Sequence, residues 1–225
     1  SDIRVTKFDA LTGHWVGLGD SLSEYGVSDT GTATYSHIVI GNGGPIVTWL
    51  DQSQAESGIQ VAQFDGTNWD SIAYSGSYNG SLGYTTTERI DRYDVSANGD
   101  QIAVTWNHSD DDTSVIEAAI YDPIHGWSNF ANQAAITNST AAYEPSITFN
   151  NNQPVIAWRD GISGFDEILC QQFDGSAWQP ITSGSNLATG VSAATGRMDH
   201  PVIRARGGEL YLVYQSSAWE MSAMT

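Results

Sequence analysis

The chain has 225 residues, of which 40% are hydrophobic, and it contains 8 Trp, 10 Tyr and 23 Gly. This composition suits one all-β domain with a buried core and many tight turns. The formal net charge is −18, from 26 acidic and 8 basic residues, which argues against nucleic acid and anionic membrane surfaces as partners. No run of 18 apolar residues is present, so no insertion into a membrane is expected.

Short apolar runs separated by Gly-, Asp- and Asn-containing turns predict β-strands along the whole chain. Residues 1–20 hold two predicted strands. Three longer stretches, at about 35–73, 92–130 and 143–182, each hold four, and two more strands fall within 199–225. The links between these stretches read as long polar loops.

Two sequence markers repeat with the same period. One is an aromatic residue followed by a turn Asp, at spacings of 56, 57 and 52 residues, and a Trp follows each of these turns. The other is an aromatic residue that ends the second strand, at spacings of 57, 52 and 56. The turn residues are Asp9, Asp65, Asp122 and Asp174, and the second-strand residues are Trp49, Trp106, Trp158 and Tyr214. A four-stranded unit repeated every ~55 residues indicates the blades of a β-propeller.

The two chain ends hold complementary halves of one repeat. We therefore predict a single domain over residues 1–225, a four-bladed propeller of four-stranded antiparallel blades, with one blade split between 199–225 and 1–20. Such a split blade would close the ring and remove open sheet edges. The alternative is a piece of a larger propeller.

The predicted turns within blades are short on one rim, whereas the loops on the other rim are long, so we place a binding site on the long-loop rim. The residues that enter each first strand should converge there, at the mouth of the central channel. The ligand-binding candidates are Tyr35, His37, Arg92, Tyr93, Asp94, Tyr143, Glu144, Arg159, Asp199, His200 and Trp219. They would bind a sugar or a cation, or they would only form hydrogen bonds and ion pairs with one another.

An acidic run inside the second repeat, Asp110, Asp111 and Asp112, is a candidate Ca²⁺ site because Ca²⁺ takes six to eight oxygen ligands. The alternative is a solvated acidic loop, since no EF-hand pattern is present. The five His residues show no zinc-ligand spacing.

The turns Phe64-Asp65-Gly66-Thr67-Asn68-Trp69 and Phe173-Asp174-Gly175-Ser176-Ala177-Trp178 resemble the Asp-box hairpins of sialidase-like propellers, in a degenerate form. Looser forms lie at 9–15 and 122–127. The resemblance implies that these Asp residues have a structural role in the turns. The blade count, but no motif, is similar to that of hemopexin-like domains, and the repeats look like those of large secreted or surface proteins of bacteria.

These observations favour a non-catalytic binding module, extracellular or on a bacterial cell surface, that recognises a glycan or a partner protein. Aromatic rings suit the C–H faces of sugars, and acidic groups suit their hydroxyls. The alternatives are a polysaccharide-active enzyme, a hydrolase or a lyase, and a structural spacer. Catalysis is the less favoured reading because no active-site motif is found and the distance between carboxylates is not fixed by the sequence.

Overall fold

The computed structural model describes residues 1–52, 57–75, 80–85, 89–110, 112–129, 136–137, 139–161, 166–181, 191–192 and 196–218. In these ranges the regular structure is all β, and no helix is present that could cross a membrane. The chain packs as two compact units, one made of 1–89, 97–102 and 121–128, the other of 90–96, 103–120 and 129–225. The predicted all-β class is therefore confirmed.

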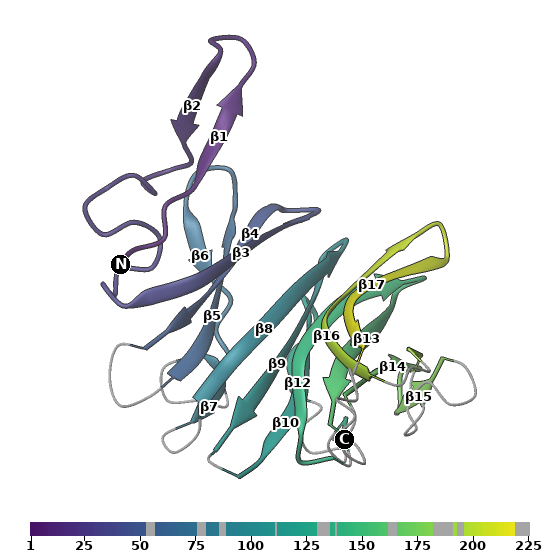
Figure 1. The fold of residues 1–225 in the computed structure, drawn as a ribbon. Coiled ribbons are helices and arrows are strands. Elements are labelled where there is room, and N and C mark those ends of the chain that lie inside the picture. The colour runs from purple at the N-terminus through teal and green to yellow at the C-terminus, as the bar shows by residue number, and fades with distance from the viewer. Residues whose placement is uncertain are drawn as a thin grey trace, which may run out of the picture. The chain divides into compact units, whose positions relative to one another are not determined.

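The first unit contains a terminal hairpin and a five-stranded sheet (Figure 1). The hairpin pairs β1 (Thr6–Asp9) with β2 (His14–Gly17). The sheet has the order β3 (Ala33–Gly41), β4 (Gly44–Asp51), β5 (Ser57–Phe64) and β6 (Trp69–Ser71). Consecutive strands are neighbours throughout, as the repeat predicted.

One strand of this sheet falls in a stretch that the sequence marks as loop. β7 (Leu82–Thr85) pairs with β5 through Ser57 and Ile59. The short β6 covers β5 only from Ala62 to Phe64, so the other half of that edge is open to another strand. Leu82 is 2% exposed, and a single apolar residue is too little for sequence periodicity to reveal.

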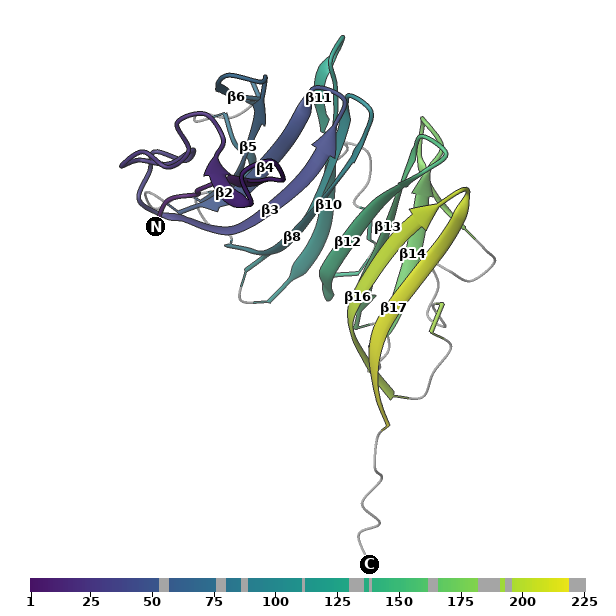
Figure 2. The ribbon, with the colours of Figure 1, turned by 90° about the horizontal axis from the view of Figure 1, so that it is seen from above.

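The next sheet has the order β11 (Gly126–Asn129), β10 (Ser114–Asp122), β9 (Gln101–Ser109) and β8 (Arg89–Asn98). In the second unit a further sheet runs β12 (Ala142–Asn150), β13 (Gln153–Asp160), β14 (Glu167–Phe173) and β15 (Trp178–Pro180). The hairpin of β16 (Gly196–Arg206) and β17 (Glu209–Ala218) follows. β16 lies beside β12 in both ribbon views (Figures 1 and 2).

The core of the second unit is built by alternation along β13. Ile156 and Trp158 belong to one apolar cluster, with side chains of β10 and β14. Val155 and Ala157 belong to another, together with Met198 and Ile203 of β16. Successive side chains of a strand point to opposite faces, so a strand between two packed layers is apolar at every position. This explains why the sequence of β13 reads as a continuous apolar run.

The carboxylate of each turn Asp accepts hydrogen bonds from backbone N–H groups of the same turn. The Oδ1 atom of Asp65 accepts from the N–H groups of Thr67 and Asn68 at 2.7 Å each, and Asp9, Asp122 and Asp174 make the same type of contact. These backbone hydrogen bonds lower the pKa of all four groups, in the case of Asp174 to about 2.

The Trp residues that follow these turns pack against the aromatic residues before them, with ring centroids 5.3–5.6 Å apart. In the first unit, Trp69 Nε1 donates to the carbonyl oxygen of Leu18, and Trp127 Nε1 donates to that of Ile72, both at 2.9 Å. Each acceptor lies just after the last strand of the preceding repeat. Trp69 and Trp127 thus join consecutive repeats.

The split blade is not formed by the strand pairs of the described residues. β1 pairs with β2, β16 pairs with β17, and each hairpin is a two-stranded sheet of its own. The number of blades and the ring closure therefore remain predictions.

Candidate functional site

Three first strands contain the same backbone irregularity. Tyr35 in β3, Glu144 in β12 and His200 in β16 have φ values of 50°, 55° and 54°. At each position the pairing with the second strand shifts register, as in a β-bulge. Left-handed backbone costs a residue other than Gly roughly 1–2 kcal/mol, so its recurrence marks a position that the fold holds under strain.

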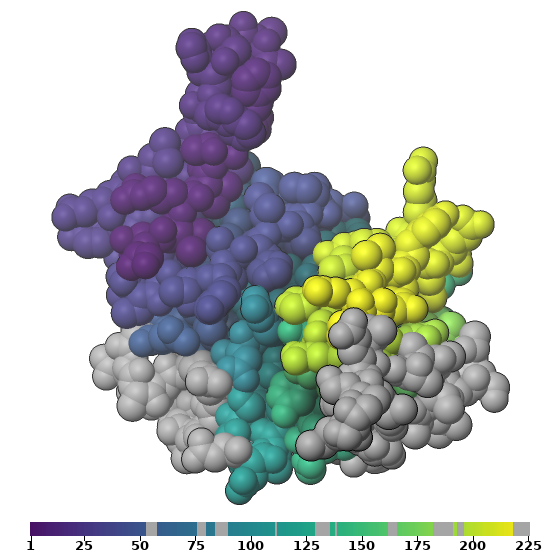
Figure 3. Space-filling model, in the orientation of Figure 1, coloured from purple at the N-terminus to yellow at the C-terminus, as the bar shows by residue number. Residues whose placement is uncertain are grey.

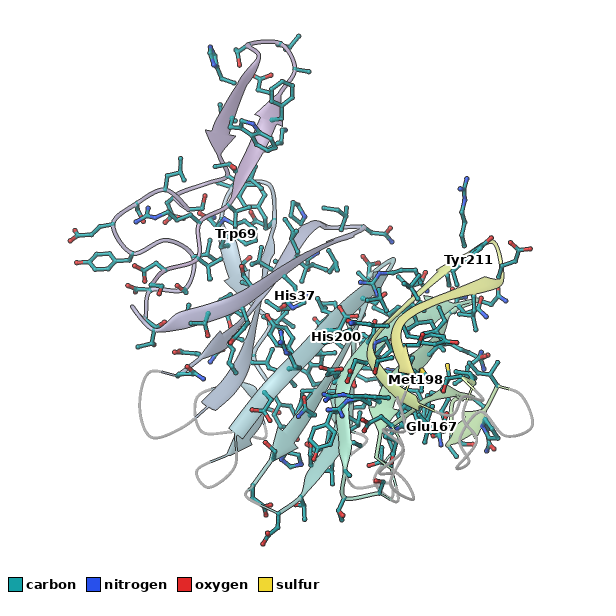
Figure 4. The ribbon with its side chains drawn as sticks, viewed as in Figure 1. His37, Trp69, Glu167, Met198, His200 and Tyr211 are labelled. Carbon is teal, nitrogen blue, oxygen red and sulfur yellow. The ribbon has the colours of Figure 1, made fainter. Side chains whose placement is uncertain are left out.

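In the second unit two of these bulges bring charged side chains together in what we call the acid–arginine cluster. Its members lie on the first strands β12 and β16, at the end of β13 and just before β14. They are Tyr143, Glu144, Arg159, Asp166, Arg197, Asp199 and His200. Figure 4 shows His200 on its strand, and Figure 3 shows the β16–β17 hairpin at the molecular surface.

Arg159 is the centre of the cluster. Its Nε lies 3.6 Å from Oε2 of Glu144 and 3.5 Å from Oδ1 of Asp199, and one terminal nitrogen lies 3.0 Å from Oδ1 of Asp166. The ring of Tyr143 lies 4.5 Å from the guanidinium carbon, which is cation–π distance. One cation therefore orders three carboxylates and an aromatic ring.

Arg197 and His200 complete the cluster from β16. Arg197 Nε lies 2.8 Å from Oδ2 of Asp199 and 3.6 Å from Oδ2 of Asp166. The hydrogen bond with Asp199 and its charge raise the pKa of Arg197. The backbone N–H of His200 donates to Oε2 of Glu144 at 2.8 Å, and its ring Nε2 lies 3.4 Å from Oε1. Each carboxylate is thus held by two separate contacts.

The side chains of the cluster are linked by ion pairs and are still reachable from solvent. The side chains of Glu144, Asp166 and Asp199 are 20%, 24% and 14% exposed, whereas that of His200 is 61% exposed. Partly exposed carboxylates offer acceptors, the guanidinium groups offer donors, and their mutual ion pairs fix both in place. Such an arrangement can bind a molecule that both donates and accepts hydrogen bonds.

The same residues also form a possible ligand set for a metal ion. One atom from each of Glu144, Asp199 and His200 lies within 4.8 Å of the others. However, Glu144 and Asp199 both contact the guanidinium group of Arg159. The positive charge that a metal ion would supply is therefore already present.

Five of the predicted ligand-binding residues meet in this cluster: Tyr143, Glu144, Arg159, Asp199 and His200. Tyr35 and His37 lie on β3 in the first unit, and Tyr35 is 60% exposed. Arg92 is exposed on β8, apart from these contacts. Trp219 lies outside the described residues.

Two predicted ligand residues are buried instead. Tyr93 is 6% exposed, so it offers no stacking surface for a ligand. It occupies the same position of the repeat as the buried Pro145 and Pro201, which face the interior. Asp94 is 8% exposed, and its Oδ2 accepts from Ser146 Oγ, the N–H of Ile147 and Arg204 at 2.8–3.2 Å. It ties β8 to β12 and β16.

The candidate Ca²⁺ loop has a local explanation. Oδ1 of Asp110 accepts from the N–H groups of Asp112 and Thr113 at 2.9 and 2.6 Å, and these bonds lower its pKa. Asp112 is exposed, and Asp111 lies outside the described part of the chain. Binding of Ca²⁺ at this loop stays a prediction.

The sequence reasoning missed a pocket in the second unit. Residues 136–137 and 139–141 of the link, the end of β13, and Leu169 and Gln171 of β14 line a pocket of about 400 Å³, and Asp160 belongs to its wall. Asp160 follows the repeat Trp by two residues, as Asp51 does in the first unit. This shared Trp-x-Asp pattern is the sequence feature from which a role for Asp160 could have been predicted.

Comparisons with known proteins support the fold. The chain matches no protein family description and no curated protein. Among solved structures it is similar to the α-L-arabinanase of Penicillium chrysogenum complexed with arabinobiose, with a TM-score of 0.52, 14% identity, and coverage of 96% of this chain and 63% of that one. It is also similar to the sialidase of Trypanosoma rangeli in complex with 2,3-difluorosialic acid, with a TM-score of 0.50, 12% identity, and coverage of 95% and 37%.

These neighbours are β-propeller glycoside hydrolases, so this chain has a β-propeller fold. The chain spans less than two thirds of the length of either neighbour. At such low identity the likeness concerns the fold alone.

Proposed function

We propose that the protein binds carbohydrate at the acid–arginine cluster. The observation that carries the proposal is the arrangement around Arg159, where three partly exposed carboxylates, a second guanidinium group and a Tyr ring are fixed within one surface. Sugar hydroxyls donate to carboxylates and accept from guanidinium groups, and a ring edge or face supports their C–H groups. The similarity to an arabinanase that holds arabinobiose supports this ligand class.

The test is a glycan-array screen of the purified protein, followed by titration of the best glycan. We expect the Asp199→Asn change to weaken binding by about 10- to 100-fold, because a hydrogen bond to a charged group contributes about 1.5–3 kcal/mol. Tyr143→Ala should also weaken binding. The matched control is Tyr211→Ala, which removes a Tyr that is 54% exposed on β17 and lies outside the cluster.

Binding that survives both cluster changes would contradict the assignment of the site. A blank array would contradict the choice of carbohydrate and would leave a partner protein, the other ligand class that the sequence favours. Circular dichroism of each variant separates loss of binding from loss of fold.

A second candidate function, hydrolysis of a glycosidic bond, is favoured by one distance. Carboxylate oxygens of Glu144 and Asp199 lie within 4.8 Å of each other, close to the ~5–5.5 Å between the paired carboxyl groups of retaining glycosidases. Against it, both carboxylates contact Arg159, and a general acid requires a carboxyl group that is set apart from cations.

Turnover separates the two functions. A glycan that binds should be incubated with the wild-type protein and with Glu144→Gln, and new reducing ends should be counted. We expect no release above the rate without protein. Release that the Glu144→Gln change abolishes would establish the enzyme instead.

We also propose that the ring has four blades and closes through the chain ends, with β17 beside β1. The repeat supplies the register. Ile156 pairs with Gln171 in the β13–β14 ladder, and the equivalent residues of the ends are Leu212 and Thr6. Paired strands bring Cβ atoms to ~4.5–5.5 Å, so cysteines at these two positions should form a disulfide with little rearrangement.

The double variant Thr6→Cys with Leu212→Cys tests this closure. We expect an intrachain disulfide in the monomer under mild oxidation, seen as faster migration on a non-reducing gel. The native Cys170 is buried, and burial raises its pKa to about 12, so it should not compete. Dimers linked through the new cysteines, or free thiols, would contradict closure within one chain. An extracellular or surface location and Ca²⁺ binding are retained as proposals.

A further inference from the structure

The pocket beside Asp160 is lined by other residue types than the acid–arginine cluster. Thr137, Ser139 and Thr140 contribute hydroxyl groups, Gln171 contributes an amide, and Ile136 and Leu169 contribute apolar surface. Its volume of about 400 Å³ falls in the range of small-molecule sites, roughly 300–1,000 Å³. Among the described residues of its wall, none is Lys, Arg or His.

Asp160 is the one ionisable residue among the described residues that line the pocket. It is 1% exposed, and its Oδ2 accepts a hydrogen bond from Trp158 Nε1 at 3.0 Å. Its Oδ1 is buried and makes no hydrogen bond. The Ser139 hydroxyl lies near enough to the carboxyl group to lower its pKa, but it makes no hydrogen bond of normal geometry with Oδ1. A buried carboxylate with an unsatisfied oxygen is costly unless a donor is supplied.

The equivalent position in the first unit shows what such a carboxylate requires. Asp51 also follows its repeat Trp by two residues and is 5% exposed. Its Oδ1 accepts a hydrogen bond at 2.7 Å from Thr32, a residue of the link that precedes its own sheet. In the described part of the link that precedes the β12–β15 sheet, Ser139 lies beside Asp160, but no hydroxyl makes an equally well-formed hydrogen bond to its Oδ1. The same carboxylate is therefore satisfied in one repeat and open in the other.

We propose that this pocket binds a small hydroxylated primary amine of amino-sugar size, with its ammonium group on Oδ1 of Asp160. The ammonium group supplies both the missing donor and the missing positive charge. The hydroxyl and amide groups of Thr137, Thr140 and Gln171 complement the ligand hydroxyls. The Ser139 hydroxyl beside the carboxylate is the group that the ammonium displaces. A neutral sugar of the same shape leaves the buried charge without compensation and binds less well.

The test is calorimetric titration with glucosamine hydrochloride, glucose and N-acetylglucosamine, which share a ring but differ in charge. Phosphate buffer is required, because Tris is itself a hydroxylated primary amine. We expect glucosamine to bind, and the two neutral sugars to bind about 10- to 100-fold more weakly. Asp160→Asn should weaken glucosamine binding by a similar factor, while keeping an acceptor for Trp158.

The matched control is Asp51→Asn, which makes the same change where the carboxylate is already satisfied, and it should leave glucosamine binding unchanged. Tyr143→Ala should also leave it unchanged, which separates this site from the proposed glycan site. If Asp160→Asn fails to fold, Gln171→Leu provides a second change in the pocket wall, with a loss of binding expected. Equal binding of the three sugars, glucosamine binding that survives both pocket changes, or no binding of glucosamine would each overturn the proposal.

Discussion

The β3–β6 sheet of the first unit and the β12–β15 sheet of the second have the same strand order but differ in the contacts of their polar side chains. Both have a Trp-x-Asp sequence at the end of the second strand, and both have a left-handed residue in the first strand. Asp51 is satisfied by Thr32, whereas one oxygen of Asp160 has no partner. Tyr35 is exposed, whereas its counterpart Glu144 joins an ion-pair cluster. The comparison teaches that the repeat conserves backbone and core, while individual polar contacts differ from copy to copy.

The largest effect is expected from removing the Trp at the end of the second strand in each sheet, which tests whether the cores around Trp49 and Trp158 contribute equally to stability. Trp49 and Trp158 are 6% and 1% exposed, and we expect Trp→Ala at either position to cost about 3–5 kcal/mol of unfolding free energy. Trp158→Ala should be the more costly, since it also removes the donor to Asp160. Urea denaturation followed by circular dichroism measures both. A loss below about 1 kcal/mol at one site would show that the two cores are not comparable.

The next effect contrasts the two carboxylates directly. Asp51→Asn weakens a charge-assisted hydrogen bond from Thr32, and we expect it to cost about 0.5–1.5 kcal/mol. Asp160→Asn removes a buried charge while the new side chain still accepts from Trp158, so its stability should be unchanged or higher. Paired denaturation curves at neutral pH decide the matter. A larger loss for Asp160→Asn than for Asp51→Asn would refute the difference that we assign to them.

The pH dependence of stability should also reveal the buried charge of Asp160. Burial raises the pKa of Asp160 above its ordinary value near 3.8, against the lowering effects of the Trp158 and Ser139 side chains. The contribution of this group to stability is therefore fully present below about pH 3.8 and is lost as the pH rises through the raised pKa. We expect the difference in stability between Asp160→Asn and wild type to grow in favour of the variant over that rise. A difference that stays constant with pH would exclude this linkage.

The smallest effect is a pH dependence of stability at Asp174, in the same sheet as Asp160 but with the opposite sign. Backbone hydrogen bonds lower the pKa of Asp174 from 3.8 to about 2. Its contribution to stability is present above about pH 3.8 and is lost as the pH falls toward 2. We expect Asp174→Asn to be slightly less stable than wild type at neutral pH and to converge with it in acid. Thermal unfolding over an acid pH series measures this, with Asp160→Asn as the contrasting variant.

Much of the fold follows from local sequence. The turn at Asp65 needs only the N–H groups two and three residues later, so a short motif is enough to predict it. The meeting of Glu144, Arg159 and Asp199 follows from the repeat, which places equivalent residues on neighbouring strands. Tyr93 is buried, which was not foreseen because the sequence alone does not reveal which face of a first strand each residue occupies. The state of Asp160 depends on where a distant link places its hydroxyl groups, which no local pattern encodes.

The left-handed residue in the first strands has a consequence for how such a molecule can change over time. Where a copied repeat keeps the bulge, its blade gains one side chain held outside the regular alternation of its strand, as in β3, β12 and β16 but not in β8, where no residue has a left-handed backbone. In this chain the three copies carry Tyr, Glu and His at that place. Since the backbone there is set by its neighbours, a substitution changes what one blade presents without repacking the core. Ligand preference can therefore diversify one blade at a time, while the inherited scaffold stays the same.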